Sequence, residues 1–267
     1  MMGDLRYAHL PIIFAIVFTL QVFATYTLAL LNGNIDPFLP YLSSAGDLRP
    51  QSCVFGLFTN ICAMLSWVII FMRHKFCTSL HTNTRFLLPR ACLNVSKYIG
   101  YAAAVGMFIV ANVQETAIVP IHQTAAIMTF ACGTLYMCFQ TYVTYTMSGR
   151  VVHQNLARFR LVLSILAVIS FFGAIIFAAI ASHVFHSYYP DLPVPRPWNK
   201  KIWQPGTGYH NVSAFFEWAA AFLHCMFIVT FAREFEDVEV EVYIYHHNAE
   251  ELSNQLRADL EQNPYGW

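Results

Sequence analysis

Long apolar stretches recur along the chain and alternate with short segments that hold most of its charged residues. An α-helix rises about 1.5 Å per residue, so roughly 20 apolar residues cross a hydrocarbon core about 30 Å thick. Six stretches of this length predict six transmembrane helices, at about 10–31, 53–72, 98–119, 124–144, 161–182 and 211–231. The chain is therefore predicted to be an all-α membrane protein, with one six-helix bundle over 1–235 and a polar tail over 236–267.

The composition supports a membrane protein. Of the 267 residues, 57% are hydrophobic and 11% are charged, whereas a soluble domain has about 25% charged residues. The formal net charge is zero, so the chain has no general electrostatic attraction for nucleic acid. The lipid bilayer is the partner that the composition predicts.

Basic residues are distributed unevenly between the two sides of the predicted bundle. Short loops that stay in the cytosol carry an excess of Lys and Arg. If both termini are cytosolic, eleven of the 15 Lys and Arg residues lie on that side. We therefore predict that both termini are cytosolic and that the basic loops and the tail face anionic lipid or cytosolic protein partners.

The tail contains one apolar pattern, a helical stripe of Leu252, Leu256 and Leu260. Such a stripe docks a partner or lies on a membrane surface. A frayed, solvated helix is the alternative interpretation, and it is favoured because the stripe is short.

Two neighbouring stretches, 98–119 and 124–144, carry polar residues close to the turn between them. Asn112 and Glu115 precede the turn, His122 follows it, and Gln140 lies deep in the second stretch. Polar groups in lipid are costly unless they face the bundle interior or a partner. This hairpin is therefore predicted to form the inner wall of the bundle.

Glu217 lies at a matching depth in the last stretch, roughly 9 Å from its start at 1.5 Å per residue, so Glu115, His122 and Glu217 could meet. The candidate intramembrane or lumenal polar cluster is Asn112, Glu115, His122, Gln140 and Glu217. Two interpretations are open. The cluster is a proton-sensitive or polar-ligand pocket, or its hydrogen bonds only fix helix packing.

Motifs of the common catalytic classes are missing from the sequence. No GxSxG, Walker loop, HExxH or Gly-rich dinucleotide turn occurs at the spacing that its chemistry requires. The seven cysteines show no CxxC spacing. We therefore expect no enzymatic activity, no cofactor and no metal site.

Three groups of residues give the chain a resemblance to a known family. The first-loop group is Pro40-Tyr41-Leu42-Ser43, Gly46, Pro50 and Phe55-Gly56. The second is Asn112-Val-Gln114, His122, Thr129-Phe130, Gly133, Tyr136-Met137 and Gln140-Thr141, and the third is Ala214, Glu217-Trp218 and Arg233-Glu-Phe235. In order and spacing these residues resemble the DRAM family (DNA-damage-regulated autophagy modulators). One departure is Gln51, where the family usually has Glu.

The resemblance implies a six-helix protein, usually of lysosomal or late endosomal membranes, that promotes autophagy and is linked to cell death. It does not imply catalysis. The first-loop residues Tyr41, Ser43, Gly46 and Pro50 join the polar cluster as the expected functional or structural centre. The wider superfamily includes plasma-membrane relatives that regulate a phosphatidylinositol 4-kinase complex and Golgi or ER relatives needed for GPI-anchor lipid remodelling, so a lipid-metabolism factor is the alternative.

Overall fold

The structure, a computed structural model, describes residues 7–84, 90–149, 151–196, 198, 204–236, 238, 257–258 and 261. The chain divides into two units, 1–236 and 237–267. The predicted leucine stripe of the tail, Leu252, Leu256 and Leu260, lies outside the described residues.

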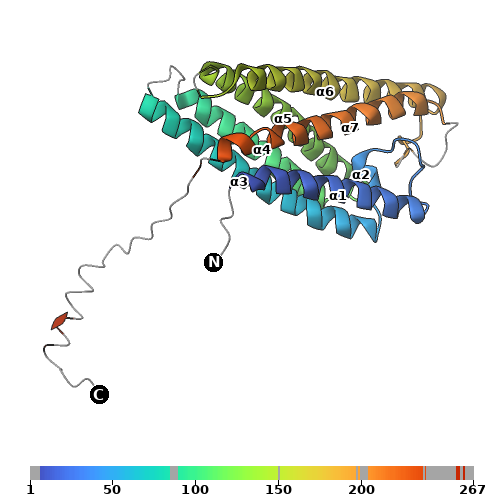
Figure 1. Ribbon diagram of the computed structural model, residues 1–267. Coiled ribbons are helices and arrows are strands. Elements are labelled where there is room, and N and C mark those ends of the chain that lie inside the picture. Colours follow the sequence, from blue (N-terminus) through green and yellow to red (C-terminus); the bar gives the residue numbers. More distant parts are fainter. Residues whose placement is uncertain are drawn as a thin grey trace. The chain divides into compact units, whose positions relative to one another are not determined.

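Within the described residues, the first unit is helical. Its elements are α1 (His9–Leu31), α2 (Leu42–Ala45), α3 (Gln51–Thr84), α4 (Arg90–Asn112), α5 (Val119–Met147), α6 (Gln154–Tyr188), α7 (Thr207–Val229) and the 3-10 helix η2 (Ala232–Phe235) (Figure 1). Six of these helices are long and apolar enough to cross a membrane. The predicted all-α fold with six membrane-spanning helices is confirmed.

Most helices extend beyond the apolar stretches that predicted them, because hydropathy marks only the part of a helix that lies in hydrocarbon. The third stretch is different. It was predicted at 98–119, but α4 begins at Arg90 and ends at Asn112. The first loop stabilises the turn that follows, since the Asp47 carboxylate accepts hydrogen bonds from the backbone N–H and the hydroxyl of Thr116. Glu115 therefore lies in the α4–α5 connection and not inside a helix.

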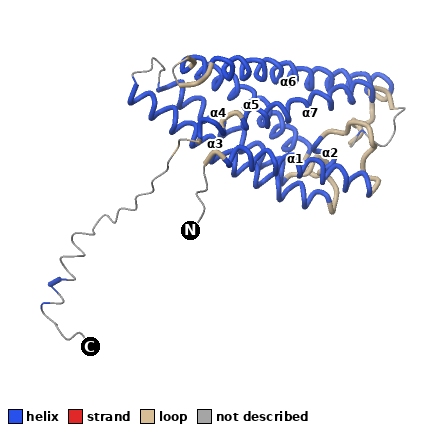
Figure 2. The backbone as a smooth tube through the Cα atoms, in the orientation of Figure 1, coloured by secondary structure: helices blue, strands red, loops and turns tan. Residues whose placement is uncertain are grey.

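The six long helices form a closed ring. Each packs against the next in chain order, and α7 packs against α1. Figure 2 shows that the long helices run roughly along one direction. The connections alternate between two ends of this ring. One end holds α2 and the turn at 113–118, and we call it the α2 end. At the opposite end α1 begins and η2 follows α7, and we call it the η2 end.

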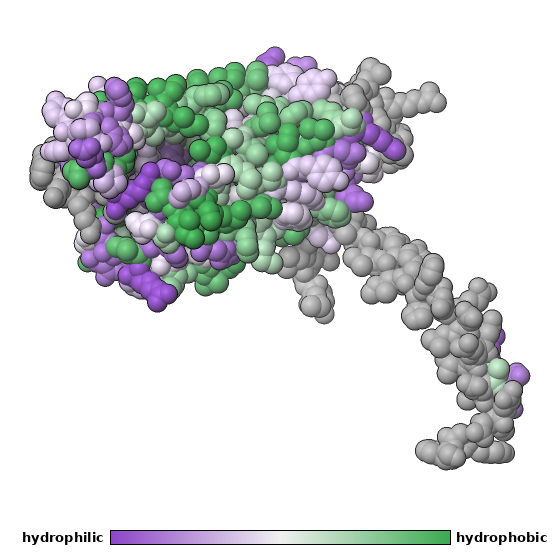
Figure 3. All heavy atoms as spheres, turned by 180° about the vertical axis from the view of Figure 1, so that it is seen from behind, coloured by the Kyte–Doolittle hydropathy of each residue, from purple (hydrophilic) through white to green (hydrophobic). Residues whose placement is uncertain are grey.

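A mainly apolar chamber of about 150 Å³ lies inside the ring, lined by residues of α1, α2, α3, α4, α5 and α7, Glu217 among them. Gln21 Nε2 and Thr59 Oγ1 are buried there with no hydrogen-bond partner among the described residues. The outer surface carries exposed large hydrophobic side chains such as Leu20 and Ile169, and Figure 3 shows hydrophobic patches over much of one face. An apolar exterior is what a bilayer-facing surface requires.

The α4–α5 hairpin was predicted to form the inner wall of the bundle, and both helices line the chamber, together with α1, α3 and α7. Val105 and Phe108 of α4 are 40% and 54% exposed on the outside of the ring. Asn112, at the end of α4, is paired with the neighbouring helix. It exchanges two hydrogen bonds with Asn60 of α3, at 2.9 and 3.2 Å. A polar residue that is paired with the neighbouring helix does not need a central position.

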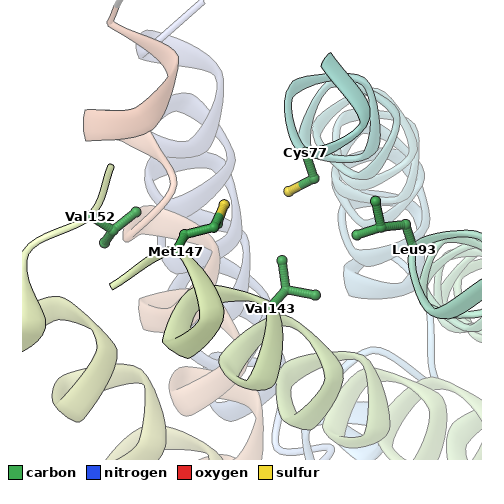
Figure 4. Packing of buried hydrophobic residues seen from close by; sticks show 5 residues of the cluster. All are labelled: Cys77, Leu93, Val143, Met147 and Val152. Carbon is green, nitrogen blue, oxygen red and sulfur yellow. The ribbon is translucent and has the colours of Figure 1, made fainter. Parts of the chain in front are cut away.

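At the η2 end, a small apolar cluster joins three helices and the loop before α6. Figure 4 shows its side chains converging from these segments: Cys77 of α3, Leu93 of α4, Val143 and Met147 of α5, and Val152 of the loop (Figure 4). Since 0–5% of each of these residues is exposed, the cluster stabilises this end of the ring.

Two fully buried arginines at the same end share one carboxylate. Arg73 of α3 places Nη1 2.7 Å from Glu234 Oε1, and Arg160 of α6 places Nη2 2.5 Å from Glu234 Oε2. Both guanidinium groups also lie over the ring of Phe231, at 5.0 and 4.7 Å from its centre. Glu234 of η2 thereby connects the chain after α7 to α3 and α6.

The remaining donors of these arginines are also occupied. Gln140 Oε1 accepts a hydrogen bond from Arg73 Nε at 3.0 Å, and Gln140 Nε2 donates to Ser96 at 2.8 Å. Arg160 donates to the hydroxyl groups of Thr144 and Thr230. Because nearly every polar atom has a partner, the buried charges hold α3, α5, α6 and η2 in one arrangement.

Glu234→Ala is expected to lower the thermal unfolding midpoint of the purified protein by several degrees. It leaves two buried arginines without their counter-charge, and removing one partner of a buried ion pair costs about 3–5 kcal/mol. The control is Glu236→Gln, which changes an exposed carboxylate two residues away. Equal midpoints for Glu234→Ala and the unaltered protein would contradict the structural role of this network.

Candidate functional site

The connection between α1 and α3 folds over the α2 end of the ring and is fastened to α7. Trp218 Nε1 donates a hydrogen bond to the carbonyl of Pro40 at 2.8 Å. Ser213 donates its one hydroxyl hydrogen to the carbonyl of Ala174, so Tyr41, 2.7 Å from Ser213 Oγ, is the donor of that bond. Burial raises the pKa of the Tyr41 phenol above its ordinary value, which keeps this donor protonated.

The other first-loop residues shape the same connection. A Cβ added at Gly46 would collide with the ring of Phe55, so the close packing of α2 on α3 requires a glycine there. Pro50 follows a cis peptide bond after Arg49. Ser43, on α2, lines a pocket together with Tyr41. The first-loop motif therefore both builds the connection and reaches into a pocket.

Glu115 joins three segments at this end. Its Oε2 accepts a hydrogen bond from Ser44 of α2 at 2.7 Å, and its Oε1 lies 2.9 Å from Nη1 of Arg196, which belongs to the α6–α7 connection. The Glu115 residue is only 4% exposed. This carboxylate and the Asp47–Thr116 contacts together fix the turn between α4 and α5.

The pocket lies between α5 and α6 and has a volume of about 280 Å³. Glu115, His122 and Glu217 line it, as the depth argument predicted. The predicted cluster is nevertheless divided. Asn112 pairs with Asn60 on the side of α4, and Gln140 binds Arg73 at the η2 end, so neither residue belongs to the pocket.

His122 and Glu217 each keep one hydrogen-bonding atom free. His122 Nδ1 lies 2.5 Å from the carbonyl of Val113, and since a carbonyl only accepts, Nδ1 is assigned the proton. His122 Nε2 is buried and has no partner among the described residues. Glu217 Oε2 accepts the N–H of Leu42 at 3.2 Å, and no hydrogen bond within the described part of the chain reaches its Oε1.

Two other histidines of α7 have different surroundings. His210 is 1% exposed and packs as an aromatic ring, stacked on Trp198 at 5.2 Å and edge-on to Tyr41 at 4.5 Å. His224 lies against Gly133 of α5, where an added Cβ would be 2.8 Å from its ring. Their sequence spacing from Glu217 therefore does not bring them into the pocket.

Sequence reasoning missed several residues of the two ends. Arg73, Arg160 and Arg196 counted only as loop charges, although each makes a specific ion pair. No local pattern marks such contacts, because they join segments far apart in the chain.

Gln51, where the resembled family usually has Glu, is fully buried with both amide atoms unpartnered among the described residues.

Comparison with known proteins places this arrangement in a family. The family model described as Frag1/DRAM/Sfk1/Cwh43P N-terminal domain matches residues 6–238. The chain belongs to this family. The match includes all six long helices and both polar ends of the bundle.

Two relatives are similar over most of their length. DNA damage-regulated autophagy modulator protein 1 of Xenopus laevis is 29% identical over 238 residues, covering 88% of this chain and 93% of the relative. DNA damage-regulated autophagy modulator protein 2 of Homo sapiens is 30% identical over 221 residues, covering 82% of this chain and 80% of the relative.

A shorter similarity concerns the modulator of macroautophagy TMEM150B of Danio rerio, which is 32% identical over 145 residues, covering 52% of this chain and 58% of that protein. No solved structure matches the chain at a significant level.

Glu115→Ala is expected to loosen the α6–α7 connection, because Arg196 and Ser44 lose their shared acceptor. Hydrogen bonds to a charged group contribute about 1.5–3 kcal/mol each. Hydrogen–deuterium exchange should show faster exchange in residues 189–196 and at the α4–α5 turn.

Asp191→Asn is the matched control, since it removes an exposed acidic group from the same connection. If Glu115→Ala exchanges no faster than Asp191→Asn in these segments, Glu115 does not organise the α2 end.

Proposed function

We propose that this protein modulates autophagy as a non-catalytic, multi-pass protein of lysosomal or late endosomal membranes. The observation that carries the proposal is the similarity, over most of the chain, to relatives named autophagy modulators. The six membrane-spanning helices and the family match are consistent with it.

We further propose that both termini face the cytosol, which places the α2 end and its pocket on the lumenal side. The Lys and Arg bias supports this orientation. Two of the eleven residues counted on the cytosolic side, Arg73 and Arg160, are buried in the ion network. Without them, nine of the remaining thirteen still lie on that side, so the bias does not depend on the buried pair.

In this proposal, the polar pocket at the α2 end is the functional site of the protein. At the η2 end the charged groups are paired with one another, whereas in the pocket His122 Nε2 is buried without a partner and no hydrogen bond within the described residues reaches Glu217 Oε1. An unpartnered buried polar atom such as His122 Nε2 is costly in a structure that serves only packing. The basic loops and the tail remain the candidate surfaces for cytosolic proteins or lipid.

An endogenously tagged protein is expected to colocalise with lysosomal markers in fed and starved cells. Golgi and plasma-membrane markers in the same cells serve as controls. A signal confined to the Golgi, the ER or the plasma membrane would contradict the proposed location and favour the lipid-metabolism alternative.

In cells whose own gene is deleted, Glu217→Gln and His122→Ala are expected to restore starvation-induced autophagic flux less well than the unaltered protein. Flux is measured as the difference in lipidated autophagosome marker with and without a lysosomal inhibitor. Glu236→Gln, outside the pocket, should restore it fully. Full restoration by both pocket variants, at equal expression and location, would show that the pocket does not carry the function.

A second candidate function is a role in membrane-lipid metabolism, as a factor in phosphoinositide-kinase regulation or GPI-anchor lipid remodelling. The specific observation in its favour is the pocket, whose apolar part opens between two membrane-spanning helices. Altered phosphoinositides or GPI-anchor lipids after gene deletion, with normal autophagic flux, would support this candidate over the first.

A further inference from the structure

The pocket at the α2 end is open to the side of the bundle. Ile127 of α5 and Ile175 of α6 line it and are 52% and 40% exposed on the apolar surface. Figure 3 shows a hollow with hydrophilic atoms inside it, bordered by hydrophobic surface. Because α5 and α6 are both long enough to cross a membrane, a molecule dissolved in the bilayer can reach the pocket without passing through water.

The pocket has both polar and apolar lining residues. Tyr41, Ser43, Glu115, His122 and Glu217 line its polar part. Alanines and large hydrophobic residues of α5, α6 and α7 line the rest, among them Ala126, Phe130, Phe171 and Ala178. A mostly apolar cavity with a few convergent polar groups is the usual form of a small-molecule site, and this combination suits a molecule with one polar end.

The free polar atoms of the pocket are hydrogen-bond acceptors. His122 carries its proton on Nδ1, so its unpartnered Nε2 accepts in the neutral ring. When the Glu217 carboxyl group is ionised, its Oε1 is a second acceptor, because Leu42 donates only to Oε2. A ligand that satisfies both atoms must supply donors.

Among the described residues, Arg196 is the one cationic side chain that lines the pocket, and it is already engaged. Arg196 pairs with Glu115 at 2.9 Å. With the Gln123 amide oxygen turned toward the guanidinium, that oxygen accepts from Arg196 Nη2 at 2.6 Å. Two carboxylates and one paired arginine give the pocket no excess of positive charge, which disfavours a phosphate or carboxylate head group.

We propose that this pocket binds a membrane lipid whose head group donates hydrogen bonds and carries no net negative charge, that is, an alcohol or an amine. The head group lies between His122 Nε2 and Glu217 Oε1. The apolar body lies along Ala126, Phe130 and Ala178 and leaves between α5 and α6 toward the bilayer. An amine and an alcohol share this donor chemistry, and the experiment distinguishes them.

The test is photolabelling of the purified full-length protein in lipid nanodiscs. The probes are photoreactive, alkyne-tagged forms of cholesterol, an alcohol, of sphingosine, an amine, and of phosphatidic acid, an anion. We expect the alcohol or the amine probe to label peptides of α5 or α6 and to be displaced by its untagged form. Labelling by phosphatidic acid should be weaker and not confined to these peptides.

Two variants on α6 test the site without removing a polar group. Ala178→Trp fills the apolar part of the pocket and is expected to reduce the specific labelling at least about fivefold. Ala179→Trp, at the next residue, adds the same side chain at an exposed position and should leave labelling unchanged. Equal labelling of the Ala178→Trp and Ala179→Trp proteins would overturn the proposal.

His122→Asn tests the head-group contact. The asparagine amide keeps a donor near the position of Nδ1 and removes the acceptor Nε2, so labelling should fall about fivefold while the unfolding midpoint changes little. Glu217→Gln removes the charge of the carboxylate. It should weaken labelling by the amine probe more than labelling by the alcohol probe, since only an ammonium group loses an ion pair. Labelling by phosphatidic acid as strong as by the other two probes would overturn the proposal.

The inference does not depend on the proposed function, since binding is measured on the purified protein. A failure of photolabelling with intact rescue of autophagic flux would reject the lipid site alone. Specific labelling without any effect on flux would reject the proposed function and leave the lipid site in place.

Discussion

The arrangement of the bundle depends on the buried contact between Glu234 and the two arginines Arg73 and Arg160. Two guanidinium groups in a membrane-spanning bundle are costly unless each finds a counter-charge and filled donor positions. The Glu234 carboxylate supplies the counter-charge. Gln140 and Thr144 accept hydrogen bonds from the arginines, and the Phe231 ring lies against both guanidinium groups. Because these groups come from α3, α5, α6 and the chain after α7, satisfying the charges fixes how the η2 ends of these helices meet.

The two ends of the α5–α6 pair are packed differently. Near the η2 end, α5 and α6 are joined by the Thr141–Ser164 hydrogen bond at 2.8 Å and by Arg160 and Thr144 at 2.7 Å. Toward the α2 end, the space between the same two helices is the pocket that Phe130 and Ala178 line. The first-loop connection closes this end through Tyr41 and the Pro40–Trp218 hydrogen bond. The pocket therefore results from two helices that are held together at one end and separated at the other.

Hydropathy predicted the six helices correctly because the bilayer demands about 20 apolar residues from each. Depth along the helices also brought Glu115, His122 and Glu217 together. Depth does not give the direction in which a side chain points, and for this reason Asn112 was placed in the wrong cluster, although it pairs with Asn60. Gln140 lies near the opposite end of α5, where it binds Arg73. Ion pairs such as Arg196–Glu115 join segments 81 residues apart, and only the packed bundle brings them into contact.

An experimental density map of the purified protein in a lipid bilayer tests most directly whether the bundle holds a lipid between α5 and α6. We expect elongated density between these helices, with its polar end within hydrogen-bonding distance of His122 Nε2 and Glu217 Oε1. At the η2 end, the density should show Glu234 in contact with both Arg73 and Arg160. A pocket that is collapsed, or that holds only water beside His122, would show that the bundle holds no lipid there.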